Sequence, residues 1–381
     1  MSRQRTIQIA QPDTGLEEWH ALRESLDSGW LTQGPKVAAF EKAFAARHNV
    51  PYALATSSCT TALHLILAAM GLKPGDEVIV PAFTWVATAN VVIYCGATPV
   101  LVDVDRNTFN MNPALVAAKV TRRTKAIIVV HLFGLCADVD AISQAAPGIP
   151  IVEDAACAAG AAYKDGRSAG ALGYAAAFSF HPRKAITTGE GGMVTTRDAR
   201  LADRINSLRN HGASISEEQR HVGAKPFLLA EFNVLGFNYR MTDLQGALGL
   251  VQLAKMDRYI AERRQWAQYY ERELARIPWL QTPAVAPGSG HGWQSYVCIV
   301  DESRAPAPRN TIMERLLEVG VHTRPGTHAV HMLGYYRERF GMHPEDYPAS
   351  RDCDQQSMAI PLHNRMLPED FAHVVSSLIN I

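Results

Sequence analysis

From about Val50 onward, short apolar runs alternate with amphipathic stretches along the chain. Several of the runs are almost continuously apolar and rich in Val and Ile, which is typical of strands covered by helices on both faces. The alternation indicates β-α units around a largely parallel sheet. The predicted strands are Glu77–Val80, Thr98–Val104, Ala126–Val130, Pro150–Glu153, Ala175–Phe180 and Gly192–Thr195.

Apolar residues at helical spacing predict helices between these strands. The predicted helices are Pro35–Ala46, Thr60–Ala69, Thr84–Tyr94, Asp138–Ala146 and Leu201–Arg209, followed by one long helix over Thr242–Arg276. We expect this long helix to leave a large domain, 1–255, which includes an N-terminal arm over 1–30, and to enter a small α+β domain over 256–381. We interpret Gly212–Gly236 as a long loop near the site.

Composition and charge narrow the classes of partner. Of the 381 residues 47% are hydrophobic, and 37 basic side chains balance 37 acidic ones, which argues against disorder, nucleic acid and a membrane surface. The N-terminus lacks the apolar core of a signal peptide, and no run approaches the roughly 20 apolar residues that cross a bilayer. The six cysteines never form C-x-x-C, which fits reduced thiols. We therefore expect a cytoplasmic protein.

The most informative segment is Ser179–Gly192, in which a predicted strand is followed by a proline, a lysine and a glycine-rich turn. This order places Lys184 at the carboxyl edge of the sheet, where open α/β sheets bind ligands. An amine held in a partly dehydrated pocket loses its proton readily and condenses with an aldehyde. Because a lone loop lysine is more often a solvated surface residue, the interpretation depends on the segments that accompany it.

Two other strand ends supply complementary chemistry. Asp154 directly follows a buried run, where a carboxylate can pair with a protonated pyridine nitrogen, as pyridoxal phosphate (PLP) requires. Ala55–His64 combines a strand end, small hydroxyl residues and a helix start, which together suit a phosphate. Taken singly, Asp154 is more often a helix cap, the hydroxyl cluster an ordinary cap and Trp85 a core aromatic residue. Only the combination predicts a PLP site.

These motifs closely resemble the DegT/DnrJ/EryC1/StrS family of sugar aminotransferases, and the resemblance spans nearly the whole chain. The implied fold is α/β, the aspartate-aminotransferase-like PLP fold type I, with a mostly parallel central sheet between helices and a smaller C-terminal α+β domain. The matching segments are Gly34–Glu41, Gly71–Pro81, Thr124–Ile127, Glu153–Ala156, Ser179–Pro182, Gly236–Asp243 and Gly334–Phe340.

The resemblance implies a role for several residues toward PLP. Lys184 would form the covalent link, Asp154 would pair with the pyridine nitrogen, and Trp85 would stack on the ring face. The implied phosphate contacts are Cys59, Thr60, Ser179 and, from the neighbouring subunit, Asn238. A site completed by a neighbour requires a homodimer.

Four positions need separate comment. Cys59 stands where the family usually has Gly, and a backbone contact survives this change if φ is negative there. Cys157 stands where most relatives have His or Gln, and a thiol cannot hydrogen-bond the cofactor's 3-hydroxyl comparably. His331 matches a family histidine near the sugar site, and His181 in the lysine loop is a second candidate substrate contact. No metal site is expected, because no carboxylate or cysteine converges on these histidines.

The resemblance implies that the enzyme moves an amino group from L-glutamate to a nucleotide-linked keto sugar, typically a 4-keto-6-deoxy sugar, by a ping-pong mechanism. The product would serve an amino sugar of a surface polysaccharide or a glycosylated metabolite. Three alternatives remain: a keto-cyclitol as acceptor, a non-catalytic regulator that senses PLP or a sugar, and a related PLP-dependent dehydratase. The dehydratases replace the lysine by histidine, so Lys184 argues against that class.

Overall fold

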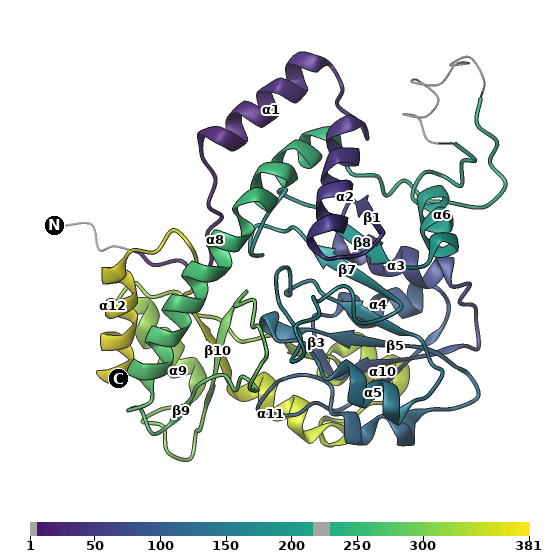
Figure 1. Cartoon of the computed structure of the whole chain (residues 1–381). Coiled ribbons are helices and arrows are strands. Elements are labelled where there is room, and N and C mark those ends of the chain that lie inside the picture. The colour runs from purple at the N-terminus through teal and green to yellow at the C-terminus, as the bar shows by residue number, and fades with distance from the viewer. Residues whose placement is uncertain (1–5, 216–228) are drawn as a thin grey trace.

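The computed structural model describes residues 6–215 and 229–381. A seven-stranded sheet with the order β1-β8-β7-β6-β5-β2-β4 lies at its centre (Figure 1). Neighbouring strands from β7 to β4 run parallel, whereas β8 is antiparallel to both β7 and β1. This confirms the prediction of a largely parallel sheet. The strands are β1 Tyr52–Thr56, β2 Glu77–Pro81, β4 Thr98–Val102, β5 Thr124–Val130, β6 Ile151–Asp154, β7 Ala175–Ser179 and β8 Gly192–Thr196.

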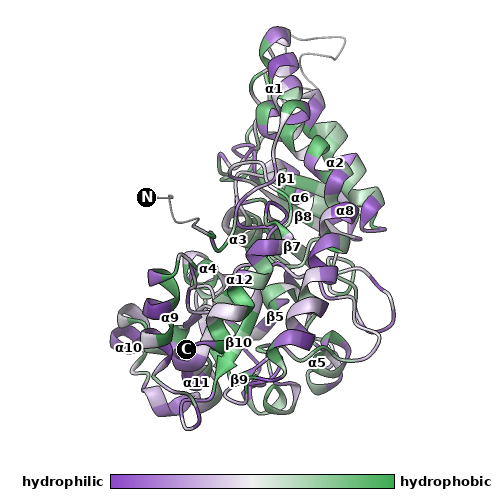
Figure 2. Cartoon of the chain, turned by 90° about the vertical axis from the view of Figure 1, so that its left-hand side faces the viewer, coloured by the Kyte–Doolittle hydropathy of each residue, from purple (hydrophilic) through white to green (hydrophobic). Residues whose placement is uncertain are grey.

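Helices cover both faces of the sheet, as Figures 1 and 2 show. On β5, Ile128 packs into the core beneath α3, α4 and α6, whereas the adjacent Ile127 packs into the core beneath α5. Since both faces are buried, the strands are apolar along their whole length. One face is covered by α3 Cys59–Ala69, α4 Ala87–Tyr94 and α6 Ala199–Leu208, and the other by α2 Pro35–Arg47, α5 Val139–Ala145 and α8 Asp243–Leu274.

The predicted helices agree with the structure within a few residues, with one informative exception. The helix expected from Thr84 begins at Ala87, because Phe83–Thr84 form a short strand, β3. This strand pairs antiparallel with β11, His328–Ala329, from the far end of the sequence. The N-terminal arm also contains a helix that periodicity did not reveal, α1 Leu16–Ser28.

The long helix α8 passes from one hydrophobic core to another. Met256 and Tyr259 pack with α2 and the central sheet, whereas Tyr270 and Leu274 pack with the C-terminal strands. The helix therefore contacts a different hydrophobic core at each of its ends. The domain boundary near residue 255 stays a prediction. Thr242 caps its first turn by accepting a hydrogen bond from the Gln245 amide, which explains where the helix begins.

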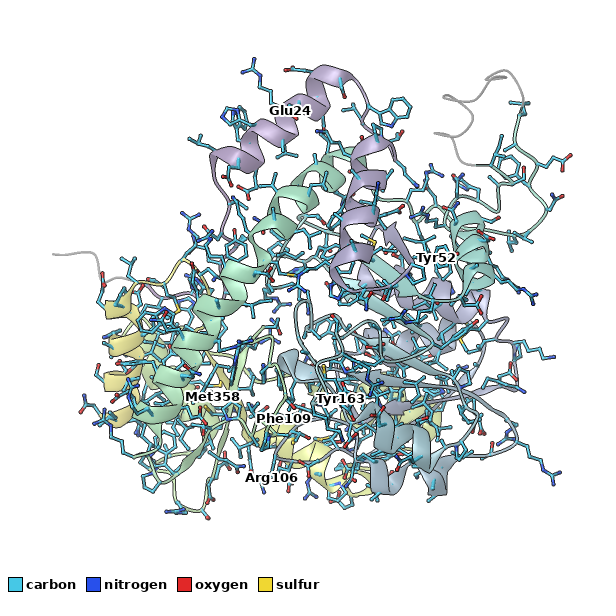
Figure 3. The ribbon with its side chains drawn as sticks, in the orientation of Figure 1. Glu24, Tyr52, Arg106, Phe109, Tyr163 and Met358 are labelled. Atoms are coloured by element: carbon cyan, nitrogen blue, oxygen red, sulfur yellow. The ribbon has the colours of Figure 1, made fainter. Side chains whose placement is uncertain are left out.

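The C-terminal part forms a small antiparallel sheet with the order β12-β10-β9 and its own core. Met358 of β12, marked in Figure 3, belongs to this core. Ile7 of the N-terminal arm packs there too and pairs with Val321. The remaining elements are β9 Leu280–Gln281, β10 Tyr296–Val300, α9 Arg309–Glu318, α10 Gly334–Phe340, α11 Pro348–Gln356, β12 Ser357–Ile360 and α12 Pro368–Ile379.

Three further sequence expectations concern the cysteines, membrane-spanning segments and the predicted loop. All six cysteines are free thiols. Within residues 6–215 and 229–381, no helix combines the length and the apolar character that crossing a bilayer demands. The centre of the predicted loop Gly212–Gly236 lies outside the described residues, and its two ends meet where the Ser214 amide donates to the Glu231 carbonyl at 2.8 Å.

Candidate active site

Lys184 lies in the loop that joins β7 to β8. Its amide donates to the His181 carbonyl at 2.8 Å and so closes a turn directly after the strand. Its Nζ atom donates to Cys157 Sγ at 3.2 Å. Because Cys157 follows the end of β6, this contact holds the half-buried amine at the carboxyl edge of the central sheet, where the sequence predicted it.

Asp154 is the last residue of β6 and is buried. Its Oδ2 accepts a hydrogen bond from the Thr88 hydroxyl at 2.8 Å, and its Oδ1 accepts one from the Ala156 amide at 3.1 Å. Burial raises the pKa of Asp154, and these two hydrogen bonds and the Lys184 charge oppose that rise. Both of these hydrogen-bond donors to the carboxylate are therefore neutral groups. A protonated pyridine nitrogen would supply the positive charge that pairs with the ionised carboxylate.

The N-terminus of α3 supplies backbone donors at the same edge of the sheet. Ser58 caps the helix by accepting the Thr61 amide at 3.1 Å. The amides of Cys59 and Thr60 have no acceptor among the residues that the structure describes, as expected for the first turn of a helix. Cys59 has a negative φ, so its side chain leaves this backbone donor usable. Free N–H groups at a helix N-terminus suit a phosphate.

Gly192 allows the start of α3 to approach β8, the strand that follows the lysine loop. A Cβ atom on Gly192, the first residue of β8, would lie 2.4 Å from the backbone carbon of Ser58. Any side chain there would push the start of α3 away from the strand that follows the lysine loop. Gly192 therefore fixes the spacing between the helix N-terminus and Lys184.

These groups line one cavity of about 350 Å³. Trp85 lies at this cavity with half of its surface exposed and its ring 5.7 Å from the ring of His328, which belongs to β11. The predicted site residues that line the cavity are Cys59, Thr60, Trp85, Asp154, Cys157, Ser179, His181 and Lys184. The set fits PLP: an amine for its aldehyde, a buried carboxylate for its ring nitrogen and free amides for its phosphate.

Cys59 and His181 have perturbed acid–base properties in this cavity. Burial raises the pKa of the Cys59 thiol, and the nearby Asp154 carboxylate raises it further. The thiol thus stays protonated, 4.0 Å from Asp154 Oδ1. Burial, together with Arg183 and Lys184, lowers the pKa of His181, so this ring is neutral near pH 7.

Two predicted site residues lie apart from the cavity lining. Asn238 is exposed, in a segment whose backbone pairs with Asn210. His331 is fully buried: its Nε2 lies 3.3 Å from the Pro344 carbonyl, and its ring packs 5.0 Å from the Tyr347 ring. A role for either residue requires the other subunit or a change in packing, and both stay predictions.

Sequence patterns did not reveal the residues that fix the end of β6 next to Asp154. Glu153 is fully buried and accepts the amides of Gly170, Leu172 and Gly173 at 2.7–2.8 Å. His131 contacts the same carboxylate through Nε2 at 2.9 Å. Glu153 thus anchors the 170–173 loop to β6. Thr88, which donates to Asp154, and Arg324, which lines the cavity, were likewise missed, because the residues that surround them are distant in sequence.

Comparison with known proteins gives consistent results. The model of the DegT/DnrJ/EryC1/StrS aminotransferase family matches residues 12–379. The spore coat polysaccharide biosynthesis protein SpsC of Bacillus subtilis is 40% identical over 373 residues, covering 97% of this chain and 95% of its own length.

Two solved structures are similar over nearly the whole chain. The PLP form of Spr1654 from Streptococcus pneumoniae, which bears the name of a sugar aminotransferase, superposes with a TM-score of 0.90 at 28% identity, covering 98% of this chain and 97% of its own. DesI in the presence of its TDP-sugar product gives a TM-score of 0.87 at 32% identity, covering 99% of this chain and 92% of its own.

Proposed function

Because the chain belongs to the DegT/DnrJ/EryC1/StrS aminotransferase family, we propose that it transfers the amino group of L-glutamate to a nucleotide-linked keto sugar. The enzyme is a PLP-dependent sugar aminotransferase with the α/β fold of its family. Membership of an aminotransferase family argues against the alternative of a non-catalytic regulator that senses PLP or a sugar. The amino donor, the acceptor and the residue roles are the parts that we propose.

One observation carries the proposal: the Lys184 amine and the buried Asp154 carboxylate share a cavity with the free amides at the start of α3. Bound PLP would supply an aldehyde for the amine and a ring that accepts the electrons left when a C–H bond beside nitrogen breaks. Asp154 would keep the ring nitrogen protonated, and Trp85 would hold the ring face. Lys184 Nζ, once displaced by the donor, would take the proton from the donor's α-carbon.

Donor and acceptor would use this one cavity in turn, which gives ping-pong kinetics. The acceptor class is supported by DesI, a structural neighbour described with a TDP-sugar product, and we propose a 4-keto-6-deoxy sugar. The biological setting is supported by SpsC, which is named for spore coat polysaccharide biosynthesis. We therefore propose a product used for a surface polysaccharide or a glycosylated metabolite, with a keto-cyclitol as the alternative acceptor.

We also propose a homodimer with shared sites, in which Asn238 reaches the neighbour's phosphate. The pattern of burial on helix α1 supports the proposal of a homodimer. The polar residues Glu18 and Ser25 are buried, whereas the apolar residues Leu16 and Trp19 are exposed. Figures 1 and 2 show α1 at the edge of the molecule, away from the C-terminal unit. A second copy would cover this apolar face, and such an interface is symmetric.

The test is a panel of nucleotide-linked keto sugars and keto-cyclitols with L-glutamate, followed by release of 2-oxoglutarate. We expect turnover with a nucleotide-linked sugar and a parallel-line pattern when both substrates are varied. Lys184→Ala is the matched control and should abolish release. Turnover of a cyclitol alone would select the alternative acceptor, and release from none of the panel would refute the proposal.

A further inference from the structure

Cys157 places a thiol against the amine of Lys184. Lys184 Nζ donates to Cys157 Sγ at 3.2 Å, and both side chains line the cavity of about 350 Å³. Each of the two residues is partly exposed, so a small solute that enters the cavity reaches the sulfur. Two nucleophilic atoms, one sulfur and one nitrogen, are therefore in contact at an accessible point.

Two turns on neighbouring strands hold these atoms together. Cys157 lies in the turn after β6, in which the Ala158 amide donates to the Ala155 carbonyl at 2.9 Å. Lys184 lies after β7, in the turn that its own amide closes on the His181 carbonyl at 2.8 Å. Because β6 and β7 pair in parallel, both turns leave the same edge of the sheet, and the sheet sets the separation of sulfur and nitrogen.

The other five cysteines, all within the described ranges, lack this combination. Burial raises the pKa of each of their thiols, so they stay protonated and react slowly. Cys59 also lines the cavity, but it is buried and its Sγ lies 4.0 Å from Asp154 Oδ1. Lys184 contacts Cys157, and Arg324 lies close enough to interact with it electrostatically. Reactive cysteines typically occupy such electropositive, partly exposed surroundings.

We infer that Cys157 and Lys184 form an oxidative modification site, at which a peroxide joins the sulfur to the nitrogen while the lysine carries a free amine. Hydrogen peroxide first transfers one oxygen atom to the thiol, which gives a sulfenic acid and water. The neutral amine then attacks the sulfur: an S–N bond forms, the S–O bond breaks, and the hydroxyl group takes an amine proton and leaves as water. The sulfur is oxidised by two electrons, the peroxide is reduced by two, and the product is a sulfenamide.

This link removes the group that the cofactor needs. A nitrogen bound to sulfur cannot condense with the aldehyde of PLP, so the oxidised chain does not hold the cofactor covalently, a consequence that rests on the proposed role of Lys184. A dithiol reverses the reaction, because its attack on the sulfur breaks the S–N bond, returns the thiol and the amine, and leaves the reductant as a disulfide. Conversely, PLP attached to Lys184 occupies the nitrogen and prevents the link.

The first experiment locates the bond by mass spectrometry. The full chain is freed of PLP, treated with hydrogen peroxide at mildly alkaline pH, which favours the neutral amine, and digested. We expect one cross-linked pair of peptides, those containing Cys157 and Lys184, lighter than their sum by two hydrogen atoms and separated by dithiothreitol. Cys157→Ser and Lys184→Ala should lose the cross-link. Cys95→Ser, which removes a half-buried cysteine outside the cavity lining, is the matched control and should keep it.

The second experiment varies the order in which PLP and peroxide are added and follows bound PLP by its absorbance. In the holoenzyme, with PLP already attached, peroxide should form no cross-link. Peroxide added first should abolish covalent attachment of PLP until dithiothreitol restores it. In Cys157→Ser, peroxide should leave the attachment of PLP at the level of the same variant without peroxide.

Three results would overturn the inference. A cross-link between Cys59 and Cys157 has the same mass change, and its loss in Cys59→Ser with survival in Lys184→Ala would identify a disulfide instead. A sulfenic or sulfinic acid that persists on Cys157 without a cross-link would show that the amine does not attack. A Cys157 thiol left intact by peroxide would show that the sulfur is unreactive.

Borohydride reduction of the untreated holoenzyme tests the proposed function separately. If PLP is fixed to Lys184 but peroxide forms no cross-link, the inference is wrong and the proposed role of the lysine stands. If the cross-link forms but PLP is fixed to another residue, the modification site stands and the proposed role of Lys184 is wrong.

Discussion

Replacing Thr88 by valine would test how the protein controls the charge on Asp154. Thr88 is fully buried on α4, and its hydroxyl donates to Asp154 Oδ2 at 2.8 Å while lying 3.0 Å from the Thr84 hydroxyl. Valine keeps the shape and removes the donor. Burial already raises the pKa of Asp154, and the Thr88 hydrogen bond is the largest opposing influence, so its loss raises that pKa further.

The size of the effect follows from the type of bond. A hydrogen bond to a charged acceptor contributes about 1.5–3 kcal/mol, and one pKa unit corresponds to about 1.4 kcal/mol, so the pKa of Asp154 should rise by about one to two units. The ionised carboxylate is the active form in our proposal. As pH falls, activity is therefore lost earlier in Thr88→Val, and the acid limb of the profile moves to higher pH by the same amount.

The assay is kcat against pH, together with the absorbance of bound PLP, in wild type, Thr88→Val and Thr88→Ser. Serine retains the hydroxyl and should keep the acid limb close to that of wild type. Thermal unfolding of each variant checks that the fold is intact. If Thr88→Val folds normally and its acid limb coincides with that of wild type, Asp154 does not depend on this hydrogen bond and the reasoning is refuted.

Three other predictions concern the proposed PLP site. Borohydride reduction should fix PLP to the peptide that contains Lys184, as mass spectrometry would show; labelling at Lys164, whose amine is paired with Asp138, would contradict the assignment. Asp154→Asn should lose most turnover yet raise the melting temperature of the PLP-free protein near pH 7. The reason is that the raised pKa of Asp154 makes the folded protein lose stability as pH rises through that value, so an equal or lower melting temperature would argue against it. Mixed dimers of Lys184→Ala and Asn238→Ala chains should recover up to half of the activity per dimer; demonstrated exchange without recovery would place Asn238 in its own subunit's site.

The local chemistry of the site could be predicted because it follows strand ends. Asp154 ends β6, Cys59 begins α3 and Lys184 lies in the loop that follows β7, so the sheet topology brings the three together. A parallel sheet was also predictable, since strands buried on both faces are apolar throughout. The residues that could be inferred are those whose position depends on the nearest element alone.

Residues defined by distant partners escaped prediction. Thr88 gains its role from Asp154, and Arg324 lines a cavity formed mostly by the first half of the chain. The expected helix over Thr84–Tyr94 started too early for the same reason, because β3 exists only through pairing with β11. Glu153 looks like part of an apolar strand, yet it is anchored by the 170–173 loop. No local pattern encodes such contacts.

The strand pairings also set an order in which the newly made chain can complete its site. The edge strand β1 has no partner in the sheet until β8 has been synthesised, since β8 is its sole neighbour there among the described strands. The segment that carries Trp85 gains its partner later still, when His328 and Ala329 emerge from the ribosome. Pairings between segments so far apart form slowly and leave apolar surface exposed meanwhile. A nascent chain that stalls before β11 should therefore hold Lys184 and Asp154 on a formed sheet but lack the wall that supports the cofactor ring.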